Sequence, residues 1–201
     1  IILATTDLSL GENRIAFSLV SKERLIRVPT AKVSSYHRSD LMVDMEHKQD
    51  NLAVFRPFPY YTRGIYTSRL IFDVPGRWII DVGFIDEGTI RRAQLFFDVE
   101  TVSRAPAVGT FAIKSYNKIA SDVHRLAQLT SGKLRDPDLY QVTIADAVEN
   151  GLPTVVVMAS PAFCVNAVCG PQVEVLHALK NEFKGQANFI HVDFYDNPET
   201  I

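Results

Sequence analysis

Residues 154–171 decide the fold of the second half of this chain, and they read Thr-Val-Val-Val-Met-Ala-Ser-Pro-Ala-Phe-Cys-Val-Asn-Ala-Val-Cys-Gly-Pro. Thr154–Met158 is a continuous apolar run, which is typical of a parallel strand buried on both faces. Apolar residues then recur at helical spacing from Pro171 to Phe183, which predicts a helix. Asn188–Tyr195 predicts a second strand, so the segment forms a β–α–β unit with a right-handed crossover and a parallel strand pair.

The only two cysteines of the chain, Cys164 and Cys169, lie between the first of these strands and the helix. Binding and catalytic sites form at the carboxyl ends of parallel strands. A helix N-terminus also favours a thiolate over a thiol, because its N–H groups are unpaired and its dipole is positive there. A turn between the two cysteines can bring both sulfur atoms within bonding distance. We therefore predict that Cys164 and Cys169 form the redox or metal-binding site.

The shortness of this loop favours a working dithiol. A disulfide across it would constrain the unfolded chain by only roughly 2 kcal/mol, and a purely stabilising disulfide would more usefully close a longer loop. Reversible thiol–disulfide chemistry is thus the first interpretation. A static structural disulfide and metal handling stay open as alternatives.

Residues 1–103 predict an all-β domain. Short segments with alternating polarity, rich in β-branched and aromatic residues, follow one another between turns. The clearest of these segments are Asn13–Val20, Gly64–Val74, Arg77–Phe84 and Arg91–Val99. Strands at this spacing are typical of an antiparallel sandwich of the immunoglobulin-like kind, and Trp78 is expected to anchor its core.

Residues 104–140 are expected to be a linker between two domains. Their composition is that of a loop, interrupted by one short predicted helix at Ser121–Leu129. From Thr143, which can cap a helix ending at Asn150, helices and strands alternate. Residues 141–201 therefore form the second domain, which is of the α/β class.

Charge and hydropathy exclude several classes of function. The formal net charge is −2 and no basic run occurs, so the chain has no electrostatic footprint for nucleic acid. No apolar stretch approaches the roughly 18 to 20 residues that a membrane-spanning helix needs. The residues after Ile1 lack the basic leader and apolar core of a signal peptide. Membrane contact is thus expected only through an anchor outside this sequence.

The cysteine loop resembles that of the thioredoxin-like superfamily. Phe163-Cys164 is similar to the Trp-Cys pair that opens the thioredoxin motif, and Cys169-Gly-Pro is similar to its Cys-Gly-Pro. Most of the chain resembles bacterial extracytoplasmic thioredoxin-domain proteins, which carry an immunoglobulin-like module ahead of a P-A-F-C-x4-C-G-P loop. The resemblance implies that residues 141–201 are the N-terminal part of a thioredoxin-like domain. It also implies a cis-proline loop, two strands and a helix beyond Ile201.

The spacing C-x4-C departs from the C-x2-C of the family, and this leaves two assignments of the cysteines. If the helix length sets the alignment, Cys164 matches the attacking thiol and Cys169 the resolving thiol. If Cys-Gly-Pro sets it, Cys169 attacks and Gln172 replaces the partner. The first assignment is preferred, because Phe163 and the helix then both match the family.

The resemblance implies thiol–disulfide exchange in the periplasm or at the cell surface, with protein thiols or disulfides as partners and no cofactor. The alternative is a non-catalytic accessory subunit of a membrane-associated assembly, which uses the sandwich and the thioredoxin-like scaffold for docking. The aromatic-rich Phe55–Tyr61 is read either as an adhesive patch for such docking or, preferably, as irregular edge-strand packing.

Copper delivery, as in Sco-type relatives of thioredoxin, is a second alternative. It requires a third ligand besides the two sulfurs, usually a histidine. His177 on the predicted helix is the nearest candidate, ahead of His191 in a strand. Met42–His47 also groups soft ligands, but a solvated loop is the preferred interpretation. No residue is assigned as a metal ligand.

Overall fold

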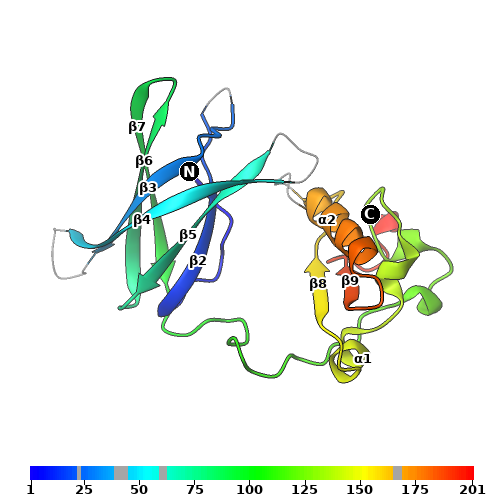
Figure 1. Ribbon diagram of the computed structural model, residues 1–201. Helices are drawn as coiled ribbons and strands as arrows, with labels where there is room; N and C mark the ends of the chain where they lie inside the picture. Colours follow the sequence, from blue (N-terminus) through cyan, green and yellow to red (C-terminus); the bar gives the residue numbers. More distant parts are fainter. Residues whose placement is uncertain (22–23, 39–44, 59–62, 165–168) are drawn as a thin grey trace. The chain divides into compact units, whose positions relative to one another are not determined.

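The computed structural model describes residues 1–21, 24–38, 45–58, 63–164 and 169–201 (Figure 1). Contacts within the chain divide it into two compact units, Ile1–Thr110 and Phe111–Ile201. We call them unit 1 and unit 2. Within the described ranges, no helix is both long and apolar enough to cross a membrane.

Unit 1 is all-β, as its sequence predicts. Its strands form one seven-stranded antiparallel sheet in the order β1-β2-β5-β4-β3-β6-β7 (Figure 1). The strands are β1 (Ile2–Leu3), β2 (Gly11–Ser18), β3 (Thr30–Arg38), β4 (Met45–Pro57), β5 (Gly64–Phe72), β6 (Gly76–Asp86) and β7 (Thr89–Val99).

The period-two pattern of β5 explains why this segment is a strand. Tyr66, Leu70 and Phe72 are buried, whereas Arg69 and Ile71 between and beside them are exposed. Successive side chains of a strand point to opposite faces, so one face of β5 enters the core and the other meets solvent. β2, β6 and β7 also coincide with predicted strands, to within a few residues at their ends.

The sheet curls until its two ends meet. Segment 8–10, which leads into β2, is hydrogen-bonded to the residue that follows β7: Leu10 N donates to Glu100 O at 3.1 Å, and Glu100 N donates to Leu8 O at 2.9 Å. One continuous sheet therefore supplies both walls of the core, an arrangement that fits a sandwich.

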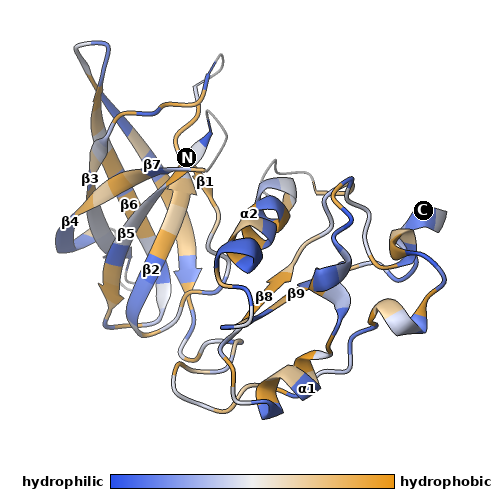
Figure 2. Ribbon diagram, turned by 45° about the vertical axis from the view of Figure 1, so that its right-hand side comes forward, coloured by the Kyte–Doolittle hydropathy of each residue, from blue (hydrophilic) through white to orange (hydrophobic). Residues whose placement is uncertain are grey.

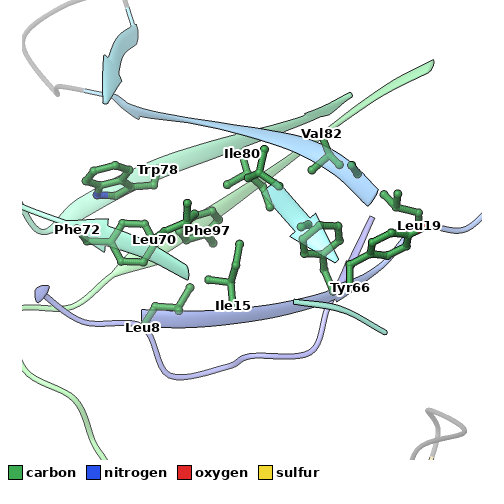
Figure 3. Packing of buried hydrophobic residues seen from close by; sticks show 14 of the residues in the cluster. Leu8, Ile15, Leu19, Tyr66, Leu70, Phe72, Trp78, Ile80, Val82 and Phe97 are labelled. Atoms are coloured by element: carbon green, nitrogen blue, oxygen red, sulfur yellow. The ribbon is translucent and has the colours of Figure 1, made fainter. Parts of the chain in front are cut away.

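The core of unit 1 is a single cluster of buried side chains between these walls, and Trp78 lies in it with no exposed surface, as predicted. Its ring lies 4.8 Å from that of Phe72, and its indole N–H donates to Val74 O at 3.0 Å. Figure 3 shows ten labelled members of the cluster: Leu8, Ile15, Leu19, Tyr66, Leu70, Phe72, Trp78, Ile80, Val82 and Phe97.

Two strands of this sheet, β3 and β4, are not among the predicted ones. Most of β4 is polar and exposed, with Ala53 its only fully buried residue, so it lacks the apolar alternation that marks a strand. It forms because β3 and β5 pair with its backbone on either side. Met45–His47 is consequently the start of β4 and not a loop, which corrects the interpretation of Met42–His47. Residues 42–44 lie outside the described part of the chain.

Unit 2 contains the predicted strand–helix–strand order. β8 (Thr154–Met158) and β9 (Asn188–Val192) form a parallel pair, and α2 (Cys169–Glu182) lies between them in the chain. The other elements are α1 (Ile144–Glu149) and the short 3-10 helices η1 (Ala120–Asp122), η2 (Leu126–Gln128), η3 (Pro137–Tyr140) and η4 (Pro198–Thr200). The prediction of one helix over Ser121–Leu129 is thus replaced by η1 and η2.

The segment expected to be a linker, 104–140, belongs in larger part to unit 2. Leu129, Leu139 and Tyr140 are buried in the same cluster as Leu176 of α2 and Phe189 of β9. The sequence does not predict this burial, because the buried residues are separated by polar turns and follow no helical or strand period. The boundary between the units lies at residues 110 and 111.

The elements of the β–α–β unit differ in two details from those predicted. The helix begins at Cys169, two residues before Pro171, and ends before Phe183, which is 41% exposed. β8 is apolar from Val155 to Met158 (Figure 2), but it is only partly buried, with Met158 55% exposed. Within the described residues its sheet has two strands, so β8 has a neighbour on one side alone.

Candidate functional site

The two cysteines form a disulfide, as their spacing predicts. Cys164 follows the turn 161–163, which comes after β8, and Cys169 is the first residue of α2. Their Cα atoms lie 6.1 Å apart, within the ordinary range for a disulfide. Residues 165–168, the inner part of the predicted loop, lie outside the described part of the chain. The disulfide thus joins the carboxyl side of a strand to the N-terminus of a helix.

The turn that carries Cys164 is held by a buried serine. Ser160 is 3% exposed, and its hydroxyl donates to the carboxylate of Asp193 and accepts from Phe194 N at 3.0 Å. The carbonyl of Ser160 accepts from Phe163 N at 3.0 Å, which closes the turn. These bonds fix the start of the cysteine loop to the residues that follow β9.

Asp193 also connects the segment around Ser131 to the start of the cysteine loop. Its Oδ2 accepts from both the backbone N and the hydroxyl of Ser131, each at 2.8 Å. The Ser131 hydroxyl in turn accepts from Ala162 N at 3.2 Å. A carboxylate that accepts several hydrogen bonds from neutral donors holds them more strongly than a neutral acceptor would. Asp193 is therefore the point to which residues 131, 160 and 162 are all connected.

The cysteines differ in their surroundings. Both side chains are half-buried. Cys169 packs against the main hydrophobic cluster of unit 2, which does not include Cys164. Cys164 directly follows the turn 161–163. Cys169 also occupies the first position of a helix of 14 residues. A helix dipole stabilises negative charge at its N-terminus, so this position favours a thiolate at Cys169 once the disulfide is opened.

A hollow of about 270 Å³ lies beside the disulfide and is lined by residues 131–134, 161–162, 170 and 173–174. Gly132 forms part of its wall, and a Cβ at that position would lie 3.2 Å from Cγ of Pro161. Segment 131–134 was not predicted to belong to the site. It lies in the expected linker, and only folding brings it beside Pro161.

Phe163, which precedes Cys164, packs edge-to-face on Tyr195, with ring centroids 5.0 Å apart. Tyr195 is 47% exposed, and the neighbouring Phe194 is 67% exposed. These two aromatic residues follow β9 and lie beyond Asp193. The cysteine loop is thus flanked by apolar side chains that remain accessible to a partner.

His177, the candidate third copper ligand, is occupied elsewhere. Its Nδ1 lies 2.6 Å from Oδ2 of Asp136, and its Nε2 lies 3.1 Å from Nδ2 of Asn181. It lies eight positions after Cys169, which is about 12 Å along a helix axis. His177, the candidate nearest in sequence, is therefore bonded to Asp136 and Asn181 and stays apart from the two sulfurs.

Asp136 is the centre of this second network and connects η3 to α2. Burial raises its pKa, but hydrogen bonds from Lys180, His177 and the backbone N of Asp138 outweigh burial and hold the pKa below the ordinary value of 3.8. Lys180 Nζ lies 2.8 Å from Asp136 and 2.9 Å from Asp138. The network orients the helix that carries Cys169.

His191 is a packed residue of β9. It is 1% exposed; its Nε2 lies 3.0 Å from Ala159 O, and its Nδ1 lies 2.6 Å from the hydroxyl of Tyr140. A carbonyl only accepts, so Nε2 carries the proton and the neutral ring accepts from Tyr140 at Nδ1. Burial lowers the pKa of His191 and raises that of Tyr140 to about 12. Both groups are neutral near pH 7.

The described residues contain no group of three histidine, cysteine or acidic side chains placed to hold one metal ion. His47, from the proposed soft-ligand group, lies 3.1 Å from Asp50 and packs edge-to-face on Tyr36. Phe55 is half-buried and packs on Tyr66, with ring centroids 5.2 Å apart, so at this residue the segment Phe55–Tyr61 packs inward. It lies in β4, which pairs with β3 on one side and β5 on the other, so the expected edge strand is wrong. Residues 59–61 lie outside the described ranges.

The site is thus a disulfide between the turn after β8 and the start of α2. A serine–aspartate network supports it, and a hollow and accessible aromatic residues flank it. Comparison of the chain with protein-family models, with curated proteins and with solved structures finds no match.

Proposed function

We propose that this chain is an extracytoplasmic thiol–disulfide exchange protein, in which an immunoglobulin-like unit 1 precedes a thioredoxin-like unit 2. The observation that carries the proposal is the position of the disulfide, at the carboxyl side of β8 and the first residue of α2. The partners are protein thiols or disulfides. A disulfide in the folded chain is also typical of oxidising compartments outside the cytoplasm.

The chemistry follows from the difference between the two sulfurs. A partner thiolate attacks Sγ of Cys164, the S–S bond breaks, and Cys169 leaves as a thiolate at the helix N-terminus. A leaving thiol with a lower pKa leaves faster. A second partner thiol then attacks the mixed disulfide, which releases Cys164. The disulfide of this chain is reduced to two thiols, and two partner thiols become one disulfide; the reverse direction uses the same steps.

The hollow beside Gly170 and the exposed Phe194 give a partner chain a place to bind while this exchange proceeds. A disulfide that served stability alone would need neither the hollow nor an exposed aromatic residue beside it. Its contribution to folding across so short a loop is roughly 2 kcal/mol at most, as the chain-entropy estimate gives.

A redox titration of the whole chain against glutathione tests the proposal. We expect a reduction potential above the about −300 mV of inert structural disulfides. We also expect one thiol in the reduced protein with a pKa below about 8.5. A potential lower than that of structural disulfides, with no reduction of a protein disulfide such as that of insulin, would refute it.

Two matched serine variants test the assignment of the sulfurs. Cys169→Ser leaves Cys164 free and should accumulate a stable mixed disulfide with glutathione, measured by intact mass. Cys164→Ser should form that adduct more slowly, because Cys169 packs against the core. Equal rates in both variants would contradict the assignment and leave the exchange itself untouched.

A non-catalytic accessory subunit is the second candidate. The exposed apolar side chains at the carboxyl end of the two-stranded sheet, Met158 and Phe194, favour a docking role. The proposals differ in one outcome. Binding of a partner that survives replacement of both cysteines by serine supports docking, whereas binding that is lost supports exchange.

A further inference from the structure

The outer face of unit 1 carries an unusual pair of like charges. In the antiparallel pairing of β2 with β5, Arg14 lies directly opposite Arg69, and both side chains are exposed. Like charges directly opposite each other destabilise a sheet. The pairing of β6 with β7 shows the ordinary arrangement, in which Arg77 lies opposite Asp98 and the two form an ion pair at 2.7 Å.

A third arginine reaches the same place from the next strand. Arg14, Arg56 and Arg69 line one hollow of about 470 Å³, together with Asn51, Leu52, Thr67 and Ser68. No acidic residue is in this lining. The three arginines of this lining thus come from β2, β4 and β5, and no acidic side chain lines the hollow with them.

The ion pairs of unit 1 show which of its arginines have an acidic partner. Arg69 has an acidic partner in Glu12. Within the described ranges of the chain, neither Arg14 nor Arg56 contacts an acidic side chain. Elsewhere in unit 1, Arg24 is paired with Asp86 and Arg92 with Asp81. The chain as a whole carries a formal charge of −2, so the cluster does not belong to a generally basic surface.

We propose that this hollow binds a tetrahedral dianion, a phosphate or sulfate group, held by Arg14, Arg56 and Arg69. An anion at this place removes the repulsion between Arg14 and Arg69. Guanidinium groups are planar forks that bind oxyanions through two parallel hydrogen bonds. One fork satisfies a carboxylate, whereas three forks and the hydroxyl of Thr67 match an anion with three accessible oxygens. The site is independent of the disulfide in unit 2.

Titration of the full chain with inorganic phosphate and with sulfate at constant ionic strength, followed by NMR of the arginine Nε–H groups, tests the proposal. We expect saturable shifts of the Arg14, Arg56 and Arg69 signals, and none with chloride. Arg14→Gln and Arg56→Gln should each lower the affinity by about tenfold or more, the loss of a charge-assisted hydrogen bond. Arg77→Gln, which removes the same charge from another place on the sheet, should leave the affinity unchanged.

Thermal unfolding separates binding from folding. Arg14→Gln removes a like-charge contact, so its melting temperature without phosphate should equal or exceed that of the parent chain. The increase caused by phosphate should disappear. Non-saturable shifts, or equal losses in Arg77→Gln and Arg14→Gln, would overturn the proposal.

The source of the phosphate group is decided by vesicles of phosphatidylcholine with or without phosphatidic acid. Binding only to vesicles that contain phosphatidic acid, lost in Arg14→Gln, assigns the site to a lipid headgroup. Binding of inorganic phosphate without vesicle binding assigns it to a small phosphorylated molecule. If neither binds, the proposal is wrong.

Discussion

The two units of this chain are stabilised by different means. Unit 1 has one contiguous cluster of buried aromatic and aliphatic side chains, and no cysteine occurs in it. Unit 2 has two smaller clusters and a disulfide beside them. Both units also bury polar side chains, for example Asp81 in unit 1 and Asp136 in unit 2. Hydrophobic burial is non-directional, whereas hydrogen-bond networks fix positions. In unit 2 the disulfide and the hydrogen bonds of Ser160 and Asp193 therefore fix the positions of the atoms around the cysteines.

The largest expected effect is the loss of a core aromatic side chain in unit 1. Phe72 is 1% exposed and contacts the rings of Trp78 and Phe97. Phe72→Ala should lower the unfolding free energy of unit 1 by about 3–5 kcal/mol. Trp78 is the only tryptophan of the chain, so its fluorescence in a urea titration reports this unit alone.

The reduction potential of the disulfide in unit 2 should not change in Phe72→Ala if the two units fold independently. Ile90→Ala, at a position that is 77% exposed, is the matched control and should change stability by no more than about 0.5 kcal/mol. A loss in Phe72→Ala no larger than that in Ile90→Ala would contradict the account of the core.

The next effect concerns the carboxylate that holds the cysteine loop. Asp193→Asn keeps the shape but weakens the bonds from Ser131 and Ser160, and should destabilise unit 2 by roughly 2 kcal/mol. Amide hydrogen exchange of Phe163 and Phe194 should become faster, while tryptophan fluorescence reports unchanged unfolding of unit 1. Unchanged exchange at both amides would mean that Asp193 does not hold the loop.

The smallest effect is a pH dependence from the buried histidine. Burial lowers the pKa of His191 below its ordinary value of 6.5, so the unfolded chain takes up a proton that the folded chain does not. The stability of unit 2 should be full above pH 6.5 and fall as the pH drops below it toward the folded pKa.

A neutral replacement tests this origin. His191→Gln should remove this part of the pH dependence, measured by urea unfolding at several pH values, whereas His124→Gln at an exposed position should not. An unchanged pH profile in His191→Gln would assign the dependence to other groups.

Sequence reasoning succeeds where the pattern is local. The alternation in β5, the capping of α1 by Thr143, whose hydroxyl accepts from Asp146 N at 3.0 Å, and the pairing of Cys164 with Cys169 all depend on residues close together in the chain. Each is predicted because backbone periodicity or a short loop fixes it.

It fails where contacts are distant or polar. β4 is stabilised by its neighbours and has almost no apolar pattern of its own. Ser131 and Asp193 are 62 positions apart, and nothing in the local sequence around either residue predicts their hydrogen bond. Tyr140 likewise lies in a turn-rich segment interpreted as a linker, whereas its burial and its bond to His191 place it in the core of unit 2. Tertiary structure determines these positions, and periodicity carries no signal for them.

The pairing of segment 8–10 with Glu100 has a mechanical consequence. The bridge between Ser9 and Glu100 is parallel, and Asp7 also accepts hydrogen bonds from Ser103 at 2.7 Å and from the backbone of Ala105 at 3.0 Å. Tension applied to the two ends of unit 1 therefore loads all these bonds at once in shear, and they cannot open one after another like a zipper. The unit should resist stretching until they break together.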